Sequence, residues 1–229
     1  MTLQKVDRDK DVTEDDLLQI FENLGKLELE FLNEARSFLK IGGKNGHIHT
    51  MDLYTSAIIN RSISLMRGFI VLAKENNYIS SVPLIRIQLD NCLRLYASTL
   101  VTDYNDFFKE YLKGTHIGHL KDANGKKMTD THLVTLLNKI FPGVHNLYKN
   151  SSGHVHFSNE HTFLSTTIVA NKERTIGTSI GYFDFYPIDK KVDFAYNMLK
   201  ASEILLGLTR SWKDQKLKVE HEILTRSLD

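Results

Sequence analysis

Three charged side chains follow each other at intervals of four residues: Arg86, Asp90 and Arg94. An α-helix has about 3.6 residues per turn, so residues four apart lie along one side of it. The surrounding sequence is strongly apolar, and a charge beside a buried face is costly unless it is paired. One interpretation is an ion pair of Asp90 with the two arginines that only stabilises the helix. The other is a guanidinium site for a phosphate or carboxylate, since the planar fork of arginine matches both anions.

A second group repeats the same interval: Tyr148, Ser152 and His156. If one helix carries all three, the two hydroxyls and the imidazole lie on one face. Histidine is the side chain best able to exchange a proton near neutral pH, so this face would have the groups for acid–base chemistry. The alternative is that Gly153 ends the helix and leaves His154 and His156 in a loop.

Histidines gather around the second group, namely His145, His154, His156 and His161. A His-x-His pair in an extended segment directs both rings to one side, as a metal site often requires. No cysteine accompanies these histidines, Glu160 is the one acidic residue at hand, and the spacing matches no recognised ligand pattern. We therefore expect neither a metal nor another cofactor.

Other catalytic motifs are absent. The glycine-rich run at 42–46 lacks the Walker pattern and follows an expected helix rather than a strand. No G-x-S-x-G elbow is present, so Ser151 and Ser152 have no support as nucleophiles. Cys92 lies among apolar residues of an expected helix, and we interpret it as a small core residue.

Apolar residues that recur every three or four positions predict the long helices that must hold these groups. Thr13 is a good N-cap for a first helix that ends near Gly42, and a second, largely buried helix is expected from Thr50 to Lys74. The third is expected as one continuous helix from Pro83 to about Leu112, which would carry the charged triplet.

Shorter elements follow. They are, in order, an exposed polar loop at 114–127 with a turn at Asn124-Gly125, a short helix capped by Thr129, a turn or helix from Pro142 and a β-hairpin at 162–183. A last long helix starts near Pro187, and its charged tail from Lys213 is expected to project into solvent or to meet a partner. The predicted fold is mainly α, a helical bundle with an inserted β-hairpin. We expect a single domain over 1–229, with a flexible start at 1–12 and a helical tail at 213–229.

The composition narrows the range of partners. The chain has 229 residues, of which 41% are hydrophobic, and its 29 basic and 28 acidic residues leave a net charge of +1. This balance gives no global reason to expect nucleic acid or an anionic membrane as a partner. One cysteine allows no internal disulfide, the first 16 residues are too polar for a signal peptide, and no apolar run approaches the roughly 20 residues of a membrane span. A cytoplasmic protein is the simplest interpretation.

Two stretches together resemble a known family. The segment from Pro83 to Arg86, with Asp90 following, resembles a P-L-x-R-x-x-x-E helix, and the segment 148–158 resembles a Y-x-x-L-S-x-x-V-H-x-S pattern. The pair is similar to a set of largely uncharacterised bacterial helical proteins allied with HEPN-like and abortive-infection families. The resemblance implies that the family arginine falls on Arg86 and the family histidine on His156, while Asp90 replaces the more usual Glu. The candidate catalytic residues are then His156 and Arg86, and the candidate ligand-binding residues are Arg94, Asp90, Tyr148, Ser152, His154 and Ser158.

The resemblance implies a HEPN-like protein of bacterial type, linked to phage defence or stress, whose polar cluster binds an anionic ligand or only holds helices together. The alternative is a metal-independent ribonuclease, with His156 as general acid/base, Arg86 or Arg94 stabilising phosphate charge and Tyr148 positioning the substrate. Ribonucleases of this kind place a histidine four to six residues after an arginine, and this chain has no such spacing. Whether the chain is an enzyme stays open at this point, and RNA or another anionic ligand is an expected partner.

A third possibility is a homo-oligomeric interaction module. The charged last helix carries Leu217, Ile223 and Leu224 at near-helical spacing, and this stripe could dock on another chain.

Overall fold

The computed structural model describes residues 12–42, 48–155, 162, 166–168, 176–178 and 186–226. The fold is mainly α, as predicted. Its helices are α1 (Glu14–Leu39), α2 (Thr50–Lys74), α3 (Tyr78–Ser98), α4 (Tyr104–Leu112), the short 3₁₀ helix η2 (Ile117–His119), α5 (Asp130–Ile140), α6 (Val144–Ser152) and α8 (Ile188–Arg226). The predicted flexible start at 1–12 lies, apart from Val12, outside the described residues.

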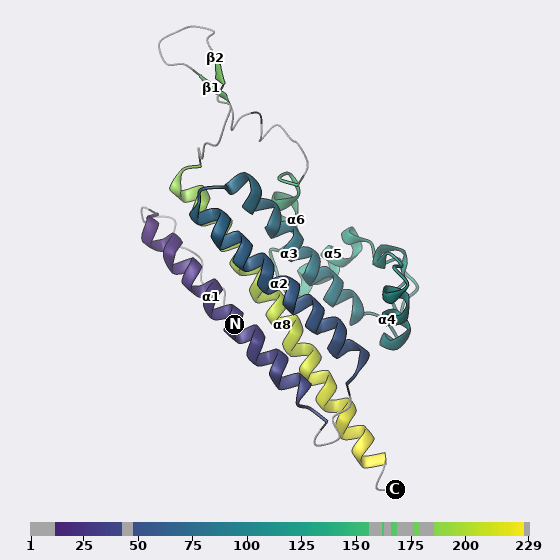
Figure 1. Cartoon of the computed structure of the whole chain (residues 1–229). Helices are drawn as coiled ribbons and strands as arrows, with labels where there is room; N and C mark the ends of the chain where they lie inside the picture. The colour runs from purple at the N-terminus through teal and green to yellow at the C-terminus, as the bar shows by residue number, and fades with distance from the viewer. Residues whose placement is uncertain are drawn as a thin grey trace.

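Four long helices, α1, α2, α3 and α8, pack side by side into a bundle (Figure 1). α3 lies between α2 and α8, and α1 packs against α8 and α2. The shorter helices α5 and α6 lie along α3, while α4 packs on α2. α3 therefore has a bundle helix on two sides and the shorter helices on another, so polar groups on that last side face α5 and α6.

The first helix follows the local rules of its sequence. The Thr13 hydroxyl accepts a hydrogen bond from the Asp16 backbone N–H, and the Asp16 carboxylate accepts one from the Thr13 backbone N–H, which forms a capping box. The predicted N-cap is confirmed. The apolar stripe of α1 is buried in the core, for example at Leu24 and Phe31.

The predicted helix over 83–112 is wrong at its start. α3 begins five residues earlier, after Asn77, whose side chain accepts a hydrogen bond from the Ser80 backbone N–H. Pro83 lies inside the helix rather than at its first position. The asparagine cap supplies a stronger local start signal than the proline, since it satisfies an otherwise unpaired helix N–H.

The same prediction is also wrong in its length. α3 ends at Ser98, and α4 begins as a separate helix at Tyr104. The Asp103 carboxylate accepts hydrogen bonds from the backbone N–H groups of Asn105 and Asp106 at 2.7 and 3.2 Å. An aspartate that binds its neighbouring backbone in this way begins a new helix instead of continuing the old one.

The predicted loop at 114–127 is more ordered than expected. Ile117 is buried, and the carboxylate of Asp122 accepts hydrogen bonds from the backbone N–H groups of Asn124 and Lys126. Gly125 has a φ of 78°, which favours glycine and confirms the predicted turn.

The predicted hairpin over 162–183 is confirmed where it is described. β1 (Thr166–Ile168) and β2 (Ile176–Thr178) pair antiparallel, with Thr166 opposite Thr178. In Figure 1 this pair stands apart from the four-helix bundle. The residues between the two strands, 169–175, lie outside the described residues.

The charged tail of α8 is not a freely projecting segment along its whole length. Lys216 is 0% exposed, and its Nζ donates to Asp52 Oδ2 over 2.7 Å and to the Phe38 carbonyl over 2.9 Å. The predicted projection into solvent is wrong for Lys216, because this lysine pairs with Asp52 in the first turn of α2 of the same chain. Leu217 is exposed, the side chains of Ile223 and Leu224 lie outside the described part of the chain, and homo-oligomerisation through them stays a prediction.

One described helix, α2, is long and apolar enough to cross a membrane by length and composition alone. The core helix of a helical bundle meets the same criterion. Here Tyr54, Ile58 and Phe69 are buried against the other helices, while Leu53 and Val71 are exposed. The prediction that this helix is largely buried is therefore right for one face only.

Candidate functional site

Arg86, on α3, meets the two shorter helices at a three-way contact. Its Nη2 donates to Asp130 Oδ2 over 2.9 Å and to the Tyr148 hydroxyl over 2.6 Å. The Tyr148 hydroxyl in turn donates to Asp130 Oδ2 over 3.1 Å. The guanidinium carbon of Arg86 lies 4.1 Å from the centroid of the Tyr148 ring, a cation–π distance. One arginine thus links α3 to the first turn of α5 and to the middle of α6.

Arg94 continues the cluster one helical turn beyond Asp90. Its Nη2 donates to Asp130 Oδ1 over 2.6 Å, and its Nε donates to Asp90 Oδ1 over 2.9 Å. Asp130 therefore binds a different arginine with each of its oxygens.

The predicted ion pair of Asp90 with both Arg86 and Arg94 is only half right. Asp90 binds Arg94, but its other oxygen accepts from Nη1 of Arg61 on α2, over 3.2 Å. Helical side chains lean toward the N-terminus, so Arg94 reaches back to Asp90 whereas Arg86 reaches away from it. Arg86 forms its ion pair with Asp130 instead.

The neighbouring charges and burial determine the protonation states of Asp130 and Tyr148. Burial by itself would raise the pKa of Asp130, but the charges and hydrogen bonds of Arg94, Tyr148 and Arg86 bring that pKa below its ordinary value. Burial raises the pKa of Tyr148. At neutral pH Asp130 is therefore a carboxylate and Tyr148 a neutral phenol, which donates to Asp130 and is not a general base.

A pocket of about 500 Å³ opens beside the cluster. Its lining residues are Arg61, Arg86, Ile87, Asp90, Tyr148, Ser152 and Val155. Small-molecule sites have volumes of about 300–1,000 Å³ and a few convergent polar groups on an otherwise apolar wall. This pocket has two guanidinium groups, one carboxylate and two hydroxyls, with Ile87 and Val155 as its apolar part.

The cluster and the pocket rim together carry an excess of positive charge. Three arginines, Arg61, Arg86 and Arg94, face two carboxylates, those of Asp90 and Asp130. Within the described part of the chain, Arg61 uses only Nη1 and Arg86 only Nη2 for hydrogen bonds. The Nη1 atom of Arg94 is buried, and no described residue accepts its hydrogen bond. Arg94 does not line the pocket, so an anion there would balance the charges of Arg61 and Arg86.

Ser152 is the last residue of α6 and lines the pocket, and its hydroxyl donates to the Tyr148 carbonyl over 2.7 Å. The helix ends there, with Gly153 as C-cap. Of the two alternatives at this position, the helix stop is confirmed, so one continuous helix does not carry all three residues of the second group.

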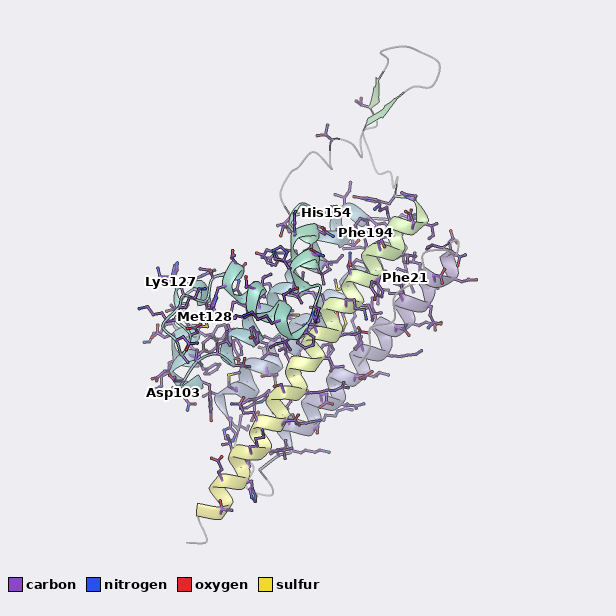
Figure 2. The ribbon with its side chains drawn as sticks, turned by 180° about the vertical axis from the view of Figure 1, so that it is seen from behind. Phe21, Asp103, Lys127, Met128, His154 and Phe194 are labelled. Carbon is purple, nitrogen blue, oxygen red and sulfur yellow. The ribbon has the colours of Figure 1, made fainter. Side chains whose placement is uncertain are left out.

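His154 is not among the residues that line the pocket. Its ring lies edge-on to Phe194 of α8, with the ring centroids 5.6 Å apart, and Figure 2 shows the two residues together near the start of α8. The predicted ligand-binding role of His154 therefore has no support from its position. His156 and Ser158 lie outside the described residues, so their predicted roles stay predictions.

Two charged residues of the pocket and the cluster, Arg61 and Asp130, are absent from the sequence-based candidates. Arg61 lies between the apolar runs of α2, but so does the exposed Arg67, so the sequence did not single Arg61 out. Asp130 directly follows the N-cap Thr129, where an acidic residue is explained by the helix dipole alone. Nothing local distinguished it from an ordinary helix start.

Cys92 and the possible metal ligands are weaker candidates for a functional site. Cys92 is fully buried in the core as predicted, and burial raises the pKa of its thiol, so it is inert. In the described parts of the chain, no three His, Cys, Asp or Glu side chains gather as a metal site. Two members of the histidine group, His156 and His161, fall outside those parts.

Comparisons of the chain with protein-family models, with curated proteins and with solved structures found no match.

Proposed function

We propose that the pocket between α2, α3 and α6 binds the phosphate group of a small ligand. The observation that supports this most is that Arg61 and Arg86, from two different helices, line one pocket while each uses a single guanidinium nitrogen for bonds within the described protein. A phosphate has several oxygens that can accept from two arginine forks at once.

The residues around Arg86 order its guanidinium in a position to bind a phosphate group. Its side chain is 17% exposed, and Asp130 and Tyr148 hold its orientation. A guanidinium that is already ordered and partly desolvated binds an anion at a lower entropic cost than a free surface arginine.

Asp90 narrows the class of ligand. Its carboxylate lines the same pocket and would repel a bare multivalent anion. A phosphate attached to a group with hydroxyl or amine donors could instead donate to Asp90. Sugar phosphates and mononucleotides have this chemistry, and the pocket volume suits them.

The experiment is isothermal titration calorimetry with AMP, ribose 5-phosphate and inorganic phosphate, on wild type, Arg61→Ala and Arg67→Ala. Arg67 is the matched control because it is an exposed arginine on the same helix that pairs with Glu28 outside the pocket. We expect AMP to bind wild type and Arg67→Ala alike, and Arg61→Ala about tenfold more weakly. Absence of binding of all three probes at millimolar concentration, or equal weakening by both substitutions, would overturn the proposal.

We also propose a wider role for the chain as a cytoplasmic bacterial protein of phage defence or stress. This role rests on the resemblance to HEPN-like and abortive-infection proteins. The ribonuclease alternative would use the same pocket, which Arg86 lines, while its general acid/base, His156, lies outside the described residues. The integrity of total RNA after induced expression in a bacterial host tests that alternative.

A further inference from the structure

A chain of buried polar side chains leads from the pocket rim into the centre of the bundle. Arg61 Nη1 donates to Asn91 Oδ1 over 2.7 Å, and Asn91 Nδ2 donates to Gln88 Oε1 over 3.1 Å. Gln88 Nε2 then donates to the hydroxyls of Ser62 and Ser202, at 2.6 and 2.9 Å. The chain thus joins α2, α3 and α8.

The direction of every bond in this chain follows from its first member. A guanidinium only donates, so Asn91 must present its oxygen to Arg61 and its NH₂ group to Gln88. Gln88 must then present its oxygen to Asn91 and its NH₂ group to the two serines. The Ser202 hydroxyl in turn donates a hydrogen bond to the Met198 carbonyl over 2.9 Å. Both amides are therefore held in one orientation.

A chain of buried polar side chains costs free energy if its role is only to pack the helices together. Asn91, Gln88, Ser62 and Ser202 are all fully buried, where apolar side chains of similar size would avoid the loss of hydration. A buried polar network does specify orientation when all its members are satisfied. The chain ends on Arg61, whose side chain is 49% exposed at the pocket. Among the described residues, its guanidinium would otherwise have only the longer, 3.2 Å hydrogen bond to Asp90 to limit its rotamers.

We infer that Asn91 and Gln88 are positioning residues, which hold the Arg61 guanidinium in the pocket so that it is ordered before the phosphate group arrives. The inference rests on the proposed function, since it concerns the affinity of the same pocket. Neither amide lines the pocket, so both act through Arg61. Ordering one long side chain in advance corresponds to an affinity gain of about threefold to tenfold.

The test is a double-mutant cycle on AMP affinity with Asn91→Leu, Arg61→Ala and the double variant, measured by calorimetry. Asn91→Leu removes the acceptor for Arg61 and keeps the side-chain volume. We expect it to weaken AMP binding about threefold to tenfold in wild type and to have no further effect once Arg61 is alanine. A loss of stability alone would not give that dependence on Arg61.

Leu95→Ala is the control for general destabilisation, because Leu95 is buried on the same helix and does not line the pocket. We expect this variant to lose stability and to keep its AMP affinity. Equal weakening by Asn91→Leu in both backgrounds, or the same weakening by Leu95→Ala, would overturn the inference. Wild type that binds none of the three probes would overturn the proposed function itself, whereas wild-type AMP binding that Asn91→Leu leaves unchanged would overturn only the positioning role.

A second measurement keeps the inference testable if Asn91→Leu does not fold. In ¹⁵N NMR of the unliganded wild type, the Nε–H group of Arg61 is expected to be rigid on the picosecond-to-nanosecond timescale. The exposed Arg36 of α1 is the reference for a mobile arginine. Motion of Arg61 equal to that of Arg36 would contradict the inference.

Discussion

The Tyr148 hydroxyl donates to the Asp130 carboxylate over 3.1 Å, at the same oxygen that accepts from Arg86. This contact joins α6 to the first turn of α5 and completes the support of Arg86. The hydroxyl accepts one hydrogen bond and donates another, so its removal affects an arginine and an aspartate together.

Tyr148→Phe is therefore expected to destabilise the fold by about 1–2 kcal/mol, since it leaves two partly buried charged groups with one hydrogen bond fewer. Urea unfolding measures this loss. Tyr111→Phe is the matched control, because Tyr111 is an exposed tyrosine whose ring stacks on Phe108. If the two variants are equally stable, the hydroxyl of Tyr148 adds nothing to the cluster.

Acid is expected to weaken the contact between α3 and α5 through Asp130. Its pKa is lower in the folded protein than the ordinary value of 3.8, so its contribution to stability is complete above pH 3.8 and is lost as the pH falls through the folded pKa. In Asp130→Asn this part of the acid sensitivity disappears. The free energy of unfolding should then fall less between pH 6 and pH 3 than it does in wild type.

The measurement is urea unfolding at both pH values, with Asp214→Asn as a control at an exposed position of α8. We expect the control to keep the acid sensitivity of wild type. An unchanged slope in Asp130→Asn would show that this carboxylate does not hold α5 against α3.

Lys216→Met is expected to be strongly destabilising, by about 3–5 kcal/mol, because it leaves the fully buried Asp52 carboxylate without its cation. Asp52 would keep its hydrogen bond from Trp212 Nε1, which is 3.0 Å away. Lys218→Met, at an exposed position of the same helix, serves as the control in thermal and urea unfolding. If both variants lose the same stability, the buried pair is not what fixes the end of α8.

Induced expression in a bacterial host tests the ribonuclease alternative, with growth and total RNA integrity followed for wild type, His156→Ala and Arg86→Ala. We expect intact RNA, because the chain lacks the arginine–histidine spacing that ribonucleases of this kind use. RNA fragmentation that both substitutions abolish, in variants shown to be folded, would favour the ribonuclease.

The local part of this architecture could be predicted from short stretches of sequence. The cap at Thr13, the cap at Thr129 and the bounds of α2 agree with the structure because each depends on residues within one or two helical turns. The spacing of Arg86, Asp90 and Arg94 placed all three on one side of a helix for the same reason.

The choice of partners depended on the packing of the helices. Asp130 lies 44 residues from Arg86, and Asn91 lies 30 residues from Arg61. Charge alone allowed Asp90 to pair with either neighbouring arginine, and the lean of helical side chains together with the position of α5 selected Arg94. The pocket exists because α2, α3 and α6 come together, and no periodicity within a single helix contains that information.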